Sequence, residues 1–157
     1  MKQKTMIEAI YVSSKPQLSR QEVLDLIEDK VNNLYNLKEP NDKTLIDLLK
    51  QPVLNYEDFT RLFTAKLKIE HKIALIENPA CPEGYLNMLG MRRDLRPAVA
   101  RSHKVNPKLL ETMSEDKDPA VRLAVAQNPI CSSSILKKLT SDQDSNIRNL
   151  ALSRLTE

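Results

Sequence analysis

Apolar residues recur along this chain in short clusters at a nearly constant interval. Four similar segments begin at residues 71, 95, 121 and 147, so they are 24, 26 and 26 residues apart. In the third segment Val121, Ala124 and Val125 lie at positions i, i+3 and i+4, which form one face of a helix. A fixed interval of this length is typical of an array of small structural repeats.

A second cluster of apolar residues follows each of the first three segments. Its members are Leu86 and Leu89, Leu110 and Met113, and Leu136 and Leu139. Asp118 can cap a helix that Pro119 opens, and Asn128-Pro129 can end it, because the residue before proline avoids the α region. Each repeat is therefore predicted to be one helix followed by a shorter one. Neither helix buries its apolar face alone, so neighbouring repeats must stack.

The N-terminal part of the chain shows a different pattern. Ser19-Arg20-Gln21-Glu22 has the form of a capping box. A helical stripe follows it and is predicted to end near Pro40; its members are Leu24, Ile27, Val31, Leu34 and Leu37. Residues 48–52 resemble residues 75–79, and Phe59 and Leu62 then take the places of Leu86 and Leu89, which indicates a degenerate earlier repeat.

These patterns divide the chain into an N-terminal helical cap and one continuous array of repeats. The cap comprises residues 1–40 and the array residues 41–157. Within the array we expect a degenerate repeat (41–70), three full repeats (71–94, 95–120 and 121–146) and a terminal helix (147–157).

The repeat sequence resembles the variant leucine-rich repeat family, a relative of the HEAT and armadillo solenoids. That family's repeat reads roughly Val-Arg, small apolar residues, Asn-Pro, two leucines and then Asp-x-Asp. Residues 121–144 match this pattern nearly throughout, whereas Ser102-His103 replaces Asn-Pro in residues 95–118. The resemblance implies an all-α fold, a right-handed α-solenoid (superhelix) of stacked two-helix repeats. The iron–sulfur segment of some members is not implied, because no cysteine precedes Cys81.

Composition narrows the class of protein further. The chain has 157 residues, no Trp and six aromatic residues (four Tyr and two Phe), so its core must be aliphatic. No apolar run is long enough to cross a membrane, and no signal peptide is recognisable, so we expect a cytoplasmic protein. The net charge of +3 allows a polyanionic partner without indicating one.

Two groups of basic residues are the candidate partner-binding patch. Lys72, Arg96, Arg122 and Arg148 occupy one repeat position. They could track a phosphate backbone or an acidic protein, or each arginine could bond Asp94, Asp118 or Asp144 at a repeat junction. We favour the junction ladder, because each such pair lies within one loop-to-helix turn. The second group does not follow the repeat: Arg92, Arg93, Arg101, Lys104 and Lys108. It is either a solvated loop or a surface for an acidic protein or nucleic acid.

No other residues indicate chemistry. Cys81 and Cys131 share one repeat position with Val105, which predicts small buried core residues rather than metal ligands. No catalytic motif is recognisable, and we expect no cofactor, no metal and no enzymatic activity.

The leading hypothesis is a non-enzymatic scaffold that binds a protein or peptide on an extended surface. The alternative is a nucleic-acid-binding HEAT-like solenoid, which the scarcity of aromatic residues in the repeats disfavours: residues 71–157 offer only Tyr85. A third reading is a structural module of a larger assembly. The chain is then expected to be a monomer, or a weak homodimer through a solenoid end.

Overall fold

The computed structural model describes residues 18–33 and 43–156, and within these ranges the chain is all-helical, with no strand. The described helices are α2 (Arg20–Asn33), α3 (Lys43–Leu49), α4 (Tyr56–Thr64), α5 (Ile69–Glu77), α6 (Glu83–Leu89), α7 (Arg96–Arg101), α8 (Pro107–Met113), α9 (Pro119–Gln127), α10 (Ser133–Leu139) and α11 (Ser145–Thr156). Among the described residues, none of these helices has the length and apolar character needed to cross a bilayer.

Helix boundaries follow local capping chemistry. Helix α9 begins as predicted: the Asp118 carboxylate accepts a hydrogen bond from the backbone N–H of Ala120, and Pro119 occupies the first turn. The helix ends at Gln127, before Asn128-Pro129, as predicted. Helix α8 begins in the same way, with the Asn106 side chain accepting from the N–H of Lys108.

The chain divides into two compact units, residues 1–41 and residues 42–157. The first unit contains α2, whose capping box is confirmed: Ser19 N–H donates to Glu22 Oε2 at 2.9 Å, and Glu22 N–H donates to Ser19 Oγ at 3.3 Å. Leu24 and Ile27 are buried, as their stripe predicts. The rest of that prediction, Leu34, Leu37 and the end at Pro40, lies outside the described residues.

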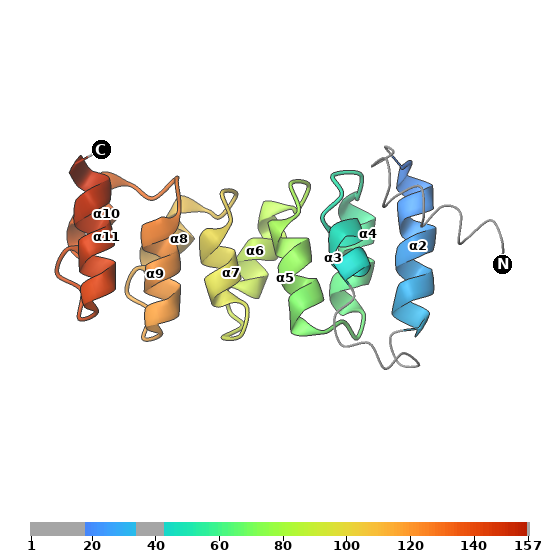
Figure 1. Ribbon diagram of the computed structural model, residues 1–157, viewed down its shortest axis with the longest axis horizontal. Helices are drawn as coiled ribbons and strands as arrows, with labels where there is room; N and C mark the ends of the chain where they lie inside the picture. Colours follow the sequence, from blue (N-terminus) through green and yellow to red (C-terminus); the bar gives the residue numbers. More distant parts are fainter. Residues whose placement is uncertain (1–17, 34–42, 157) are drawn as a thin grey trace. The chain divides into compact units, whose positions relative to one another are not determined.

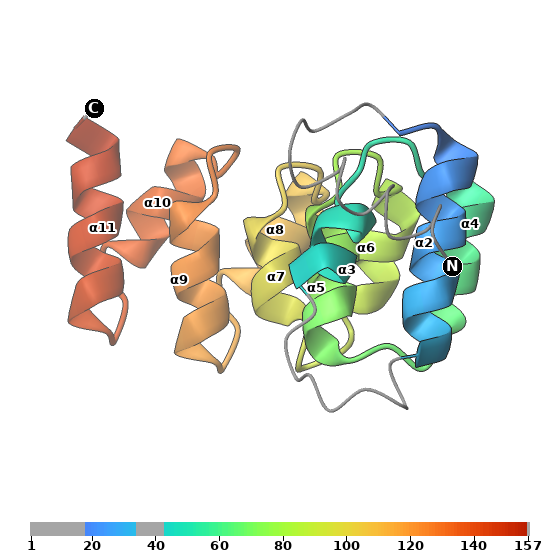
Figure 2. The same ribbon diagram turned by 45° about the vertical axis from the view of Figure 1, so that its right-hand side comes forward.

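In the second unit α3, α5, α7, α9 and α11 follow one another in a row (Figures 1 and 2). Helix α3 packs on α5, α5 on α7, α7 on α9, and α9 on α11. The shorter helices complete the junctions: α6 contacts α7, α8 contacts α9, and α10 contacts both α9 and α11.

The core of the second unit is aliphatic apart from Phe59 and Phe63 of α4. Val121, Ala124 and Val125 are fully buried, and Leu136 and Leu139 of α10 are buried as well, as predicted. Both cysteines are buried and reduced, in agreement with the valine at the equivalent position. Burial raises the pKa of the Cys81 thiol to about 11.

Candidate interaction surface

The arginines of the repeat column form a ladder that runs from loop to loop. Arg122 donates from Nε and Nη2 to the two carboxylate oxygens of Asp142, at 2.7 and 2.9 Å. Its Nη1 donates to the backbone oxygen of Asp116 at 2.8 Å. Arg122 therefore joins the loop before its helix to the loop at the end of its own repeat. Arg96 and Asp116 form the equivalent pair one repeat earlier, at 2.5 Å.

These pairings correct the sequence-based assignment of the acidic partners. The ladder is expected from the sequence to use Asp94, Asp118 and Asp144, which lie within one turn of the arginines. Asp94 instead pairs with Arg92. The other two carboxylates cap the next helix: Asp118 accepts from Ala120 N–H and Asp144 from Asn146 N–H. In each Asp-x-Asp loop the first carboxylate holds an arginine, and the second starts a helix.

Asp142 is the most strongly held of these carboxylates. Its side chain is almost fully buried, and the Arg122 guanidinium lowers the pKa of the Asp142 carboxyl. Asp142 also accepts a hydrogen bond from Asp144 N–H at 2.9 Å, which lowers that pKa further. A guanidinium that is bidentate to a buried carboxylate is a strong contact and is not free to bind a second anion.

The loop between α6 and α7 departs from this arrangement. Arg92 N–H donates to the backbone oxygen of Leu89, as Asp116 N–H does to Met113 and Asp142 N–H to Leu139. Arg92 therefore stands where the later loops have the arginine-binding aspartate. Its guanidinium pairs instead with Asp94, through contacts of 3.2 and 2.7 Å in solvent. The charge of this loop is thus reversed relative to the later loops.

A second set of side-chain bonds holds the other ends of the first helices. Asn128 Nδ2 donates to the backbone oxygens of Ala100 and Ser102 in the preceding repeat, at 2.7 and 2.9 Å. Asn78 Nδ2 makes the same two bonds to Leu49 and Gln51. We call this arrangement the asparagine clamp.

The repeat position that Asn78 and Asn128 occupy holds a different residue in two other segments. Arg154 stands 26 residues after Asn128, and its Nη1 donates to the backbone oxygens of Ala126 and Asn128 at 2.6 and 2.7 Å. Ser102 stands 24 residues after Asn78, and among the described residues its side chain makes no bond to the preceding repeat. The junction of α5 with α7 therefore lacks the clamp that its neighbours have.

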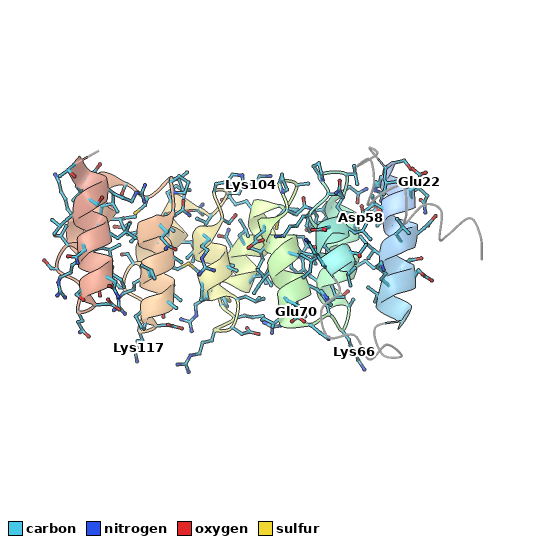
Figure 3. The ribbon with its side chains drawn as sticks, viewed as in Figure 1. Glu22, Asp58, Lys66, Glu70, Lys104 and Lys117 are labelled. Carbon is cyan, nitrogen blue, oxygen red and sulfur yellow. The ribbon has the colours of Figure 1, made fainter. Side chains whose placement is uncertain are left out.

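The structure separates the members of the predicted basic patch. Arg96, Arg122 and Arg148 lie in the ladder, at the N-terminal ends of their helices. Arg101, Lys104 and Lys108 lie in or beyond α7 at its other end, and Lys104 and Lys117 mark the two opposite edges of the row in Figure 3. Lys104 Nζ donates to the backbone oxygen of Pro79. Arg93, Arg101 and Lys108 are exposed, and their side chains bond none of the described residues.

Four aromatic rings meet on helices α4 and α6, a cluster that sequence reasoning missed. The Tyr85 ring lies 5.0 Å from Phe63, 5.5 Å from Tyr56 and 6.5 Å from Phe59, measured between centroids. The Tyr85 hydroxyl is also 2.5 Å from Thr60 Oγ1. The signal available was Tyr56, which lies one turn before Phe59 on the face of α4 that meets the next repeat.

Exposed apolar side chains follow this cluster on α6 and in the loop after it. Met88 follows Tyr85 by three residues and lies on the same helix face. Tyr56 is 67% exposed, Met88 52% and Met91 86%, and Arg92 and Arg93 come next in the chain. We call these residues the aromatic surface: Tyr56, Tyr85, Met88, Met91, Arg92 and Arg93.

A hollow lies between α8 and α10. Its volume is about 240 Å³, and its lining includes Pro107, Lys108, Glu111, Ile130 and Ile135. This is below the usual range of about 300–1,000 Å³ for small-molecule sites. Across residues 18–33 and 43–156, no three His, Cys, Asp or Glu side chains gather as a metal site would require.

Comparison of the chain with protein-family models, with curated proteins and with solved structures returned no match. The function proposed below therefore depends on the residues and their geometry alone.

Proposed function

We propose that this chain is a non-enzymatic scaffold, a right-handed solenoid of two-helix repeats, that binds a protein or peptide at the aromatic surface. The observation that carries the proposal is the exposure of Tyr56, Met88 and Met91 beside Arg92 and Arg93. Tyrosine, methionine and arginine are enriched in the buried centres of protein interfaces, whereas an ordinary surface is richer in lysine and glutamate.

Recurring bonds at equivalent positions support the repeat architecture. The ladder pairs Arg96 with Asp116 and Arg122 with Asp142, each 20 residues apart. The asparagine clamp recurs at Asn78 and Asn128. Because each clamp reaches into the preceding repeat, adjacent repeats are held in one register, as a stacked array requires.

The aromatic surface has the composition of a docking site. Tyr56 and Tyr85 present large rings with few rotatable bonds, so ordering them on binding costs little conformational entropy. Phe59 and Phe63 support these rings from below, because both are buried. Arg93, which follows Met91 and Arg92 in the chain, supplies a basic group that favours a partner with acidic groups near its apolar anchor, whereas Arg92 is already paired with Asp94.

The ladder gives less support to the nucleic-acid alternative. A phosphate-tracking stripe needs free basic groups, but Arg96 and Arg122 are paired with carboxylates. The acidic loops at the same edge would also repel a polyanion.

Site-specific photo-crosslinking in lysate of the source cells tests the proposal. A benzoylphenylalanine placed at Tyr56 or Met88 is expected to yield a discrete protein adduct. The same group at Gln127 or Lys137, exposed positions on α9 and α10, is the matched control and should yield none. Adducts of equal intensity at all four positions, or at none, would contradict binding at the aromatic surface.

A fluorescence anisotropy titration separates the two partner classes. Labelled duplex DNA and single-stranded RNA are titrated with the protein at about 50 and 200 mM salt. Under the proposal neither binds in the micromolar range. A micromolar affinity that falls steeply with salt would favour the nucleic-acid alternative, and charge reversal at Arg92 and Arg93 would then locate the contact.

A further inference from the structure

Helix α11 lies at one end of the row of first helices and presents an incomplete rung of the ladder (Figure 1). Arg148 Nη1 donates to the backbone oxygens of Asp142 and Gln143, at 2.7 and 3.0 Å. Arg122 Nη1 makes the equivalent bonds to Asp116 and Lys117. Arg148 is therefore placed in the same way as Arg122 with respect to the loop before it.

Arg122 and Arg148 differ in the partners of their other two donor atoms, Nε and Nη2. Nε and Nη2 of Arg122 hold the Asp142 carboxylate, whereas Nε and Nη2 of Arg148 bond none of the described residues. A guanidinium that is oriented by its Nη1 presents these two N–H groups in a fixed fork, which matches the two oxygens of a carboxylate. The fork of Arg148 is thus oriented for a carboxylate that the described residues do not supply.

The apolar side chains of α11 are also less buried than their counterparts in α9. Ala126 follows Arg122 by four residues, so it lies on the same helix face, and it is fully buried. Leu152 follows Arg148 by the same interval but is 51% exposed, and Leu155, three residues further along that face, is only half-buried. This face of α11 is equivalent to the face of α9 that α11 covers. The described residues leave its two leucines partly exposed, and none of them binds the remaining donors of its arginine.

The charge of α11 indicates what covers it. Residues 145–156 contain Arg148 and Arg154 and no carboxylate. The nearest acidic side chains among the described residues are already engaged: Asp142 with Arg122, and Asp144 with the N–H of Asn146. A second copy docked through its own α11 would bring arginine to arginine, so it does not complete the rung.

We propose that the outer face of α11, formed by Arg148, Leu152 and Leu155, docks an acidic amphipathic helical segment of a partner protein. Its carboxylate fills the Arg148 fork, and its apolar side chains cover the two leucines. The internal junction is the template: α11 and the Asp142 loop cover α9 in this way. This surface is separate from the aromatic surface and does not depend on it.

A peptide that copies residues 132–156 tests the proposal, because it carries α10, the Asp142 loop and α11, the elements that cover α9. Stapling its α11 segment keeps the helix formed, which circular dichroism verifies. Binding to the protein is measured by fluorescence anisotropy. We expect micromolar binding that weakens at least tenfold when the peptide carries Asp142→Asn, a change that leaves the protein itself untouched.

Variants of the protein give the reciprocal measurement. Arg148→Gln and Leu152→Glu should each weaken peptide binding at least tenfold, whereas Lys137→Gln, which removes an exposed charge from α10, should leave it unchanged. A helical peptide that fails to bind, or that binds equally with and without its carboxylate, overturns the proposal. So does a homodimer by light scattering that Leu152→Glu dissociates, because a second copy would then be the occupant.

Discussion

Asn128 is only 1% exposed, yet every polar atom of its side chain has a partner. Nδ2 donates to two backbone oxygens of the preceding repeat, and Oδ1 accepts from Ile130 N–H at 2.9 Å. A buried amide that is fully hydrogen-bonded fixes the register of two helices, because a slip of one residue would leave several polar groups without partners.

Replacing Asn128 with alanine should destabilise the protein strongly. The change leaves the oxygens of Ala100 and Ser102 without their side-chain donor, and it also opens a small cavity. The expected loss is about 2–3 kcal/mol in the free energy of unfolding, measured by urea denaturation. Asn149→Ala, at an exposed position on α11, is the matched control and should change stability by less than about 0.5 kcal/mol.

Ser102→Asn should have the opposite effect. Ser102 occupies the clamp position between α5 and α7, where its side chain is too short to reach the preceding repeat. An asparagine there is expected to donate to the backbone oxygens of Ile76 and Asn78, and to stabilise the protein by about 1 kcal/mol. A rise in the urea midpoint that is absent in Ser153→Asn would support this. Unchanged or lower stability would mean that the junction geometry does not accept the clamp.

At the scale of helices and loops, the ladder links elements that share no backbone hydrogen bonds. Arg122 joins the α8–α9 loop to the α10–α11 loop through Asp116 and Asp142. Its side chain is 14% exposed and that of Asp142 is 4% exposed, so the pair is shielded from solvent and from salt screening. Such a pair is costly to break, because one charge would remain buried alone.

The ladder should make the free energy of unfolding depend on pH. Arg122 holds the pKa of the Asp142 carboxyl below its usual value of 3.8. A lowered folded-state pKa contributes stability that is present above about pH 4 and is lost as the pH falls through the folded-state pKa. Unfolding free energies between about pH 5 and 2 should therefore fall more steeply in the wild type than in Asp142→Asn. Glu111→Gln, at an exposed carboxyl, should keep the wild-type slope; equal slopes in all three proteins would contradict the assignment.

At the scale of the whole array, the α5–α7 junction differs from its neighbours at both ends. The clamp is absent at Ser102, and Arg92 takes the place of the arginine-binding aspartate on the other edge. In addition, Arg96 Nε is buried without a hydrogen-bond partner. Parts of a protein that are joined by few stabilising contacts separate at a lower free energy than the rest, so this junction is where the second unit is expected to open first.

Hydrogen exchange in mild urea should detect this junction. Residues 43–90 and residues 95–156 are expected to lose protection as two separate blocks, because the contacts between them lack both the asparagine clamp and the arginine–aspartate pair. Mass spectrometry of peptic fragments would report two midpoints, which Ser102→Asn should bring closer together. A single midpoint for all fragments in the wild type would show that the junction is as strong as the others.

Sequence reasoning predicted local features better than distant pairings. The caps at Ser19 and Asp118 and the helix end at Asn128-Pro129 were predictable, because each involves residues within four positions of one another. The acidic partner of Arg122 was not, because Asp118 is near in sequence whereas Asp142 is brought near only by packing. The aromatic surface was missed for the same reason: Tyr56 and Tyr85 lie in different repeats and meet only when α4 and α6 pack together.

The placement of the ladder has a consequence for how such a chain can lengthen. Arg122 and Asp142 lie within the one segment 121–146, so a tandem duplication of that stretch of gene would carry both halves of the ion pair. The clamp behaves differently, since Asn128 takes its acceptors from whichever segment precedes it, and those acceptors are backbone oxygens that any sequence provides. A duplicated segment would thus contain both residues of its ion pair, and its asparagine would bind the preceding segment whatever side chains that segment has. The chain could therefore lengthen by 26 residues without a compensating mutation.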